Sequence, residues 1–117
     1  MILRLTVDGH TVAAALNGSP AARDLADLLS LTLDLKDFHH TERIGYPPRK
    51  LDTTNAPDPA APKAGDLAYY APWGNLALFY RDGGPASSDL LILGHHSDES
   101  EVARIAMADR VRFDAAA

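Results

Sequence analysis

The chain contains no cysteine and carries fewer basic than acidic residues. Without cysteine there are no disulfides, no thiolate metal sites and no cysteine nucleophile. Lysine and arginine number 11 against 16 acidic residues, which gives a net charge of −5. Proteins that bind nucleic acid non-specifically need clustered cations to neutralise phosphates, and anionic membrane surfaces attract polybasic segments. The sequence therefore predicts neither a nucleic-acid partner nor a membrane partner.

Long apolar runs are also missing. No segment approaches the ~20 consecutive apolar residues that a membrane-spanning helix requires. The first ten residues alternate polar and apolar side chains, whereas a signal peptide needs an unbroken apolar centre. We therefore expect a cytoplasmic protein. A length of 117 residues with 46% apolar side chains predicts a single domain, 1–117, able to bury a core of its own.

The N-terminal third predicts a hairpin followed by a helix. The apolar-rich runs Ile2–Val7 and Thr11–Leu16 flank Asp8-Gly9, and Asp-Gly suits a tight turn that needs positive φ at both central residues. Ser19-Pro20 then provides a helix cap followed by proline in the first turn. Leucines at helical spacing continue this pattern and predict a helix over residues 20–29.

The middle of the chain predicts short strands and one long loop. Leu31–Lys36 alternates strictly between leucine and polar residues, as in an antiparallel sheet with one solvated face. Ile44–Tyr46 is a further short strand, which Pro47-Pro48 ends. Asp52–Ala64 contains three prolines and predicts a semi-rigid surface loop.

Most of the aromatic residues gather in one segment. Residues 65–80 hold the single tryptophan and three of the four tyrosines, and they predict two strands, Asp66–Ala71 and Leu76–Arg81, joined at a Pro-Trp-Gly-Asn turn. Leu90–Leu93 is a short apolar run typical of a strand buried on both sides. Ser97 or Asp98 caps a second helix, and Arg110–Asp114 closes the chain as a strand. About eight short strands and two helices predict a mainly β barrel or sandwich.

The order of these elements resembles that of the cyclophilin-like proteins of bacteria. The resemblance covers nearly the whole chain and rests on four motifs and the strand from Leu90 to Gly94. The motifs are the Asp8-Gly9 hairpin, the helix Ala21–Leu29 followed by Leu31-Thr32-Leu33, the segment Glu42–Leu51 with Arg43-Ile44-Gly45-Tyr46-Pro47, and the strand pair from Gly65 to Tyr80. The resemblance implies a closed or nearly closed eight-stranded antiparallel β-barrel with two capping α-helices and a cleft on its outer wall.

True cyclophilins use such a cleft to isomerise X-Pro bonds, and this chain departs from their pattern. Isomerisation needs an apolar pocket for the proline ring and a fixed cationic donor for the twisted amide, a role that suits arginine. True cyclophilins place that arginine directly after a Phe-His pair, whereas here Phe38-His39 is followed by His40, and Arg43 comes three positions later. The glutamine expected just before the aromatic pair Phe79-Tyr80 is absent as well.

The sequence therefore favours a cyclophilin-like protein that binds a small molecule or an extended peptide in a cleft on the barrel wall. Aromatic residues with one acid and one base suit such a ligand. The predicted ligand-binding residues are Glu42, Tyr46, Tyr70, Trp73, Phe79 and Tyr80.

Two enzymatic alternatives remain open from the residues alone. One is a peptidyl-prolyl cis-trans isomerase with Arg43 as its catalytic residue. The other is a metal-dependent enzyme built on the pairs His39-His40 and His95-His96, although adjacent strand residues point to opposite faces and each pair supplies one ligand at most. Exposed loop positions explain the histidines without a metal, so the sequence predicts no metal site and no cofactor.

Overall fold

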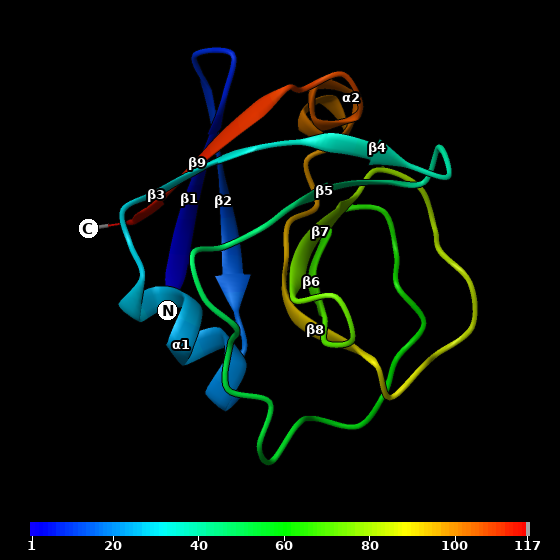
Figure 1. Cartoon of the computed structure of the whole chain (residues 1–117). Helices are drawn as coiled ribbons and strands as arrows, with labels where there is room; N and C mark the ends of the chain where they lie inside the picture. Colours follow the sequence, from blue (N-terminus) through cyan, green and yellow to red (C-terminus); the bar gives the residue numbers. More distant parts are fainter. Residues whose placement is uncertain (117) are drawn as a thin grey trace.

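A computed structural model describes residues 1–116 of the chain; Ala117, the last residue of the predicted domain, lies outside the described residues. Within residues 1–116 the chain forms nine strands and two helices (Figure 1). Their bounds are β1 Ile2–Val7, β2 His10–Leu16, α1 Pro20–Asp27, β3 Leu31–Asp34, β4 Lys36–Phe38, β5 Glu42–Gly45, β6 Asp66–Tyr70, β7 Asn75–Phe79, β8 Leu90–His95, α2 Glu99–Ala106 and β9 Arg110–Ala115.

The predicted N-terminal hairpin is confirmed. Strands β1 and β2 pair antiparallel from Ile2 opposite Ala15 to Val7 opposite His10. The two turn residues both have positive φ, 50° at Asp8 and 80° at Gly9, as a two-residue turn of this type demands.

The prediction of a mainly β, antiparallel fold is confirmed, but the strand number of eight is wrong. All nine strands described belong to one sheet in the order β3-β9-β1-β2-β8-β6-β7-β5-β4. The extra strand arises because Leu31–Phe38 divides at Leu35, where the chain changes neighbours: β3 pairs with β9, and β4 pairs with β5. Among residues 1–116 no backbone ladder joins the two ends of the sheet, so it is not closed by hydrogen-bonded strands.

The two ends of the sheet nevertheless lie close together. A Cβ atom added to Gly45, at the end of β5, would lie 3.0 Å from the carbonyl oxygen of Asp34 in β3. The Leu35 amide donates to the Asp109 carbonyl at 2.8 Å, and Arg43 Nε donates to the Ala108 carbonyl at 2.9 Å. The sheet therefore curls round. Gly45 allows its ends to approach closely because it has no side chain, and the Arg43 side chain joins them through its hydrogen bond to the Ala108 carbonyl.

Both predicted helices are present, on opposite sides of the curled sheet in the view of Figure 1. Ser19 caps α1 by accepting a hydrogen bond from the Ala22 amide, and Leu25 of this helix is fully buried. The helix ends at Asp27, two residues before the predicted end. Asp98 caps α2 by accepting from two backbone amides of the first turn. Neither helix among the described residues has the length and apolar composition needed to cross a membrane.

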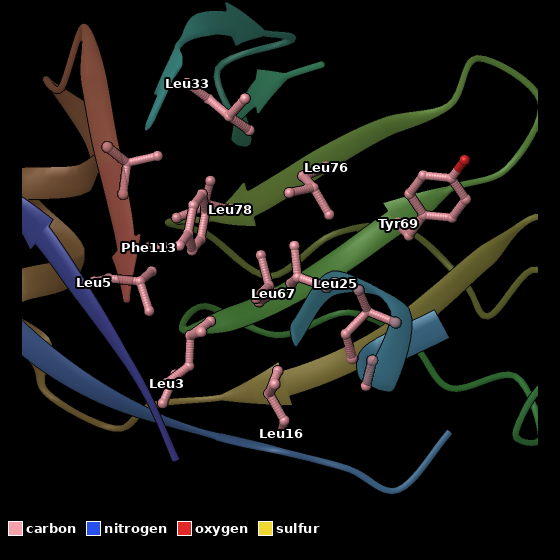
Figure 2. Packing of buried hydrophobic residues seen from close by; sticks show 14 of the residues in the cluster. Leu3, Leu5, Leu16, Leu25, Leu33, Leu67, Tyr69, Leu76, Leu78 and Phe113 are labelled. Atoms are coloured by element: carbon pink, nitrogen blue, oxygen red, sulfur yellow. The ribbon is translucent and has the colours of Figure 1, made fainter. Parts of the chain in front are cut away.

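Alternate residues of the strands fill the interior, as Figure 2 shows for ten labelled side chains. Those from the strands include Leu3 and Leu5 of β1, Leu67 and Tyr69 of β6, Leu76 and Leu78 of β7 and Phe113 of β9. A second, smaller cluster lies apart from this core. It contains Ala68, Ala77 and Phe79, packed against the half-buried Ile44, Leu90 and Ile92. This second cluster lies beneath the candidate site.

Candidate functional site

Three rows of side chains cross the outer face of the sheet over strands β4 to β8. Residues directly opposite one another in neighbouring strands project to the same face, so the register defines each row. The first row is Phe38, Glu42 and Phe79; the second is Lys36, Ile44, Ala77, Ala68 and Ile92; the third is Asn75, Tyr70 and Leu90. Two alanines thus lie between rows that carry larger side chains, and their small size leaves a depression in the middle of the face.

Two adjoining hollows open on this face. The larger, which we call the loop-side hollow, has a volume of about 260 Å³ and lies between the strands and residues 83–87. The smaller, the aromatic hollow, has a volume of about 180 Å³. Its lining consists of Phe38, Glu42, Ile44, Tyr70, Trp73 and Asn75. Phe38, Glu42 and Tyr70 line both hollows, so these three side chains separate one from the other.

Phe79 forms the back wall of the loop-side hollow and is itself only 3% exposed. Two loops cover it. The Gly83 amide donates to the Pro62 carbonyl at 2.9 Å, and a Cβ atom at Gly83 would lie 2.5 Å from the Pro62 ring and 2.9 Å from the Phe79 ring. Pro62 thus packs the Pro-rich loop against the glycine-rich turn. The Phe79 ring beneath them is buried and forms part of the wall of the hollow.

Three aromatic rings line the aromatic hollow. Trp73 lies in the turn between β6 and β7 and is 51% exposed. Its ring stands edge-on to Phe38, with ring centres 5.5 Å apart at 86°, and edge-on to Tyr70, at 5.4 Å and 89°. Aromatic pairs favour this perpendicular arrangement, which also fixes the orientation of the three rings. The rings therefore form a pre-arranged wall on one side of the hollow.

Glu42 is the single ionisable acid that lines either hollow within the described part of the chain. Burial, followed by the nearby negative charge of Asp37, raises the pKa of Glu42 from its ordinary 4.5 to about 7. No lysine or arginine of residues 1–116 lines the hollows to compensate the charge. A carboxyl group held in this way titrates near neutral pH, which is typical of functional sites.

Asn75, at the end of β7, contributes an unsatisfied acceptor to the same hollow. The side chain is 2% exposed, and its Nδ2 donates to the Leu76 carbonyl at 3.3 Å. Its Oδ1 has no hydrogen-bond donor among the described residues. A buried amide oxygen left without a donor is destabilising by about 1–3 kcal/mol and needs an explanation.

Three of the predicted site residues lie elsewhere. Arg43 faces away from the hollows: its guanidinium donates to the Ala108 carbonyl and lies 3.4 Å from Asp109. The Tyr80 hydroxyl donates to Asp37, the largest of the effects that lower the pKa of Asp37. Tyr46 is 57% exposed and lines neither hollow. Glu42, Tyr70, Trp73 and Phe79 do line the two hollows, whereas Arg43, Tyr46 and Tyr80 line neither.

The paired histidines do not meet in a metal site. His39 and His40 occupy the turn between β4 and β5 with positive φ of 53° and 54°, a region that histidine enters more readily than most residues. His95 Nδ1 lies 2.6 Å from Asp66 Oδ1, whereas His96 is buried and burial lowers its pKa. Within residues 1–116 no three His, Asp or Glu side chains are arranged to hold a metal ion.

Three residues that line the aromatic hollow, Phe38, Ile44 and Asn75, are absent from the predicted ligand-binding set. A signal was present for Phe38, because it is the phenylalanine of the Phe-His pair that the family resemblance singled out. The sequence places Asn75 in the turn before the second strand, and its burial depends on the pairing of β6 with β7, which carries no local signal. Loop residues such as Pro62 gave no local signal at all.

The mainly β antiparallel sheet with a helix on either side is a cyclophilin-like fold. The family model described as the Cyclophilin-like family matches residues 5–114, and the chain belongs to this family. A hypothetical protein from Archaeoglobus fulgidus, solved in solution, has the same fold with a TM-score of 0.68 and 18% sequence identity. The match covers 99% of this chain and 95% of that protein. A search of curated proteins found no match.

Proposed function

We propose that this protein binds a small ligand in the two adjoining hollows of its outer face. The observation that carries the proposal is the half-buried carboxyl group of Glu42 between aromatic rings, with no lysine or arginine in either hollow and His39 at the edge of the loop-side hollow alone. A partly desolvated acid without a partner lowers stability, so a chain retains one where it serves a purpose other than folding.

The chemistry of the site suits recognition. Pockets for small molecules are lined mainly by apolar and aromatic groups, with a few polar groups that orient the ligand. Here Phe38, Tyr70 and Trp73 supply the apolar surface, and Glu42 supplies the polar contact.

The isomerase alternative finds no support in the position of Arg43. An arginine that stabilises a twisted amide must present free donors to the cleft, whereas Nε and one terminal nitrogen of Arg43 both donate to the Ala108 carbonyl. We therefore propose a binding function in preference to proline isomerisation.

Thermal unfolding against a panel of amines, carboxylic acids, sugars and short X-Pro peptides tests the proposal. A ligand at one hundred times its Kd adds ~2.7 kcal/mol to the free energy of unfolding, which for a domain of this size raises Tm by roughly 10 °C. Binding should also change the emission of Trp73, the single tryptophan.

A pair of tyrosine variants locates the site. Tyr70→Ala should abolish the shift because Tyr70 lines both hollows, whereas Tyr46→Ala removes an equally large but exposed ring outside them and should leave it intact. If no compound in the panel changes Tm or Trp73 emission, or if Tyr46→Ala is the variant that loses binding, the proposal is wrong.

A further inference from the structure

The charges of the side chains that line the aromatic hollow narrow the class of ligand that it can bind. This step rests on the proposed function and asks which class of molecule the smaller hollow accepts. Glu42 and the unpartnered amide oxygen of Asn75 both present negative charge or partial negative charge at this hollow, and no cationic side chain of residues 1–116 lines it. An anionic ligand would meet repulsion from both groups, and a neutral apolar ligand would desolvate the Glu42 carboxyl further.

The rings favour the same sign of charge. The face of an aromatic ring carries negative potential and attracts cations within about 6 Å of its centre. Phe38 and Tyr70 each stand perpendicular to Trp73, with centres 5.5 and 5.4 Å from it. Phe38 also stacks on His39, with ring centres 4.0 Å apart at 26°, so one face of Phe38 is covered and the rings available to a cation are chiefly those of Tyr70 and Trp73.

The hydrogen-bonding groups decide between kinds of cation. A primary ammonium group carries three N–H donors, and each needs an acceptor once it leaves water. The polar side chains of the hollow are those of Glu42, Tyr70 and Asn75, and the Asn75 oxygen is buried behind the surface. Methylation removes donors while it keeps the charge, so a methylated ammonium needs fewer acceptors than a primary ammonium and can place its methyl groups against the rings.

We infer that the aromatic hollow binds the methylated ammonium group of a small organic cation, with the rings of Tyr70 and Trp73 against the methyl groups and the Glu42 carboxylate as counter-ion. The volume of about 180 Å³ accommodates such a head group, and the rest of the molecule extends into the adjoining loop-side hollow. Because burial raises the pKa of Glu42 to about 7, the counter-ion is fully charged only at mildly alkaline pH.

Choline and its uncharged isostere 3,3-dimethylbutan-1-ol form the test. The two molecules have nearly the same shape and differ in the charged nitrogen. Titrations followed by Trp73 emission and by Tm at about pH 8 should show choline binding roughly 2- to 30-fold more tightly than the isostere. Glu42→Gln should remove most of this preference, whereas Glu99→Gln, the same change at an exposed position of α2, should leave it unchanged.

The outcomes separate the inference from the proposed function. Equal binding of choline and the isostere would overturn the inference while the hollows remain a binding site. The same conclusion follows if choline fails to bind but another compound of the panel binds in a manner that depends on Tyr70. If neither these probes nor any panel compound binds, the inference and the proposed function fall together. A preference for choline that survives in Glu42→Gln would overturn the assigned role of the carboxylate.

Discussion

Replacing Glu42 by glutamine should stabilise the protein, and only above mildly acidic pH. The unfolded chain releases the Glu42 proton near the ordinary pKa of 4.5, whereas the folded chain holds it to about 7. Between these values the folded state binds more protons than the unfolded state. The free energy of unfolding therefore falls as pH rises through this window, and it falls no further above about 7. Glutamine keeps the shape of the neutral acid and removes this dependence.

The pKa shift sets the size of the effect. A change from 4.5 to about 7 corresponds to on the order of 3 kcal/mol at most. Glu42 is half-buried and borders open hollows, so solvent screens part of its charge. We therefore expect Glu42→Gln to raise the free energy of unfolding by about 1–2 kcal/mol at pH 8. Near pH 4 the variant and the unaltered protein should differ little.

Urea unfolding followed by Trp73 emission measures this difference at a series of pH values. Taking the difference between two proteins cancels the titration of the histidines and of the other acids. Asp37 is the neighbour that matters most for Glu42, and the hydrogen bond from the Tyr80 hydroxyl lowers the pKa of Asp37 below its ordinary value. Glu99→Gln serves as the control and should show no pH-dependent gain. The reasoning would be refuted if Glu42→Gln raised the free energy of unfolding by the same amount at pH 5 and pH 8. It would also be refuted if NMR showed the Glu42 carboxyl titrating near 4.5.

Two further predictions concern the junction between the ends of the sheet. Gly45→Ala should lower the free energy of unfolding by about 1–3 kcal/mol, because the added Cβ lies 3.0 Å from a backbone oxygen, whereas Gly84→Ala meets nothing within 4 Å and should be nearly neutral. Arg43→Ala should cost about 1.5–3 kcal/mol through the lost bonds to the Ala108 carbonyl, against little for the exposed Arg81→Ala. Urea unfolding checks both, and Arg43→Ala as stable as Arg81→Ala would contradict this role.

The local elements could be predicted because each carries its own signal. Asp8-Gly9 specifies a tight hairpin, Ser19-Pro20 starts α1, and Asp98 caps α2, all through contacts within a few residues. The division of Leu31–Phe38 into two strands has no such signal. It depends on which neighbour each half meets, β9 or β5, and those partners lie far along the chain.

In the site too, features set by neighbouring residues could be predicted, whereas contacts between distant parts of the chain could not. Alternation along a strand already assigns Glu42 and Arg43 to opposite faces, and likewise Phe79 and Tyr80. Sequence reasoning could therefore have separated these pairs, and it could have chosen Phe38, which lies opposite Glu42 on the same face. It could not have found that Pro62 and Gly83 pack over Phe79, since that contact joins two loops without regular structure.

Glu42 combines a feature that the local sequence sets with one that distant neighbours set. Its place on the outer face follows from the strand period, but its unusual pKa follows from neighbours on other strands: Phe38 beside it, Tyr70 across β7, and Asp37 as a second negative charge. A lone glutamate between a histidine turn and an arginine looks like half of a surface ion pair. The sheet turns that arginine to the other face and binds it to the Ala108 carbonyl, which leaves the carboxylate without a cation of its own. A cationic ligand is the group whose charge and size would satisfy what folding leaves unpaired at this position.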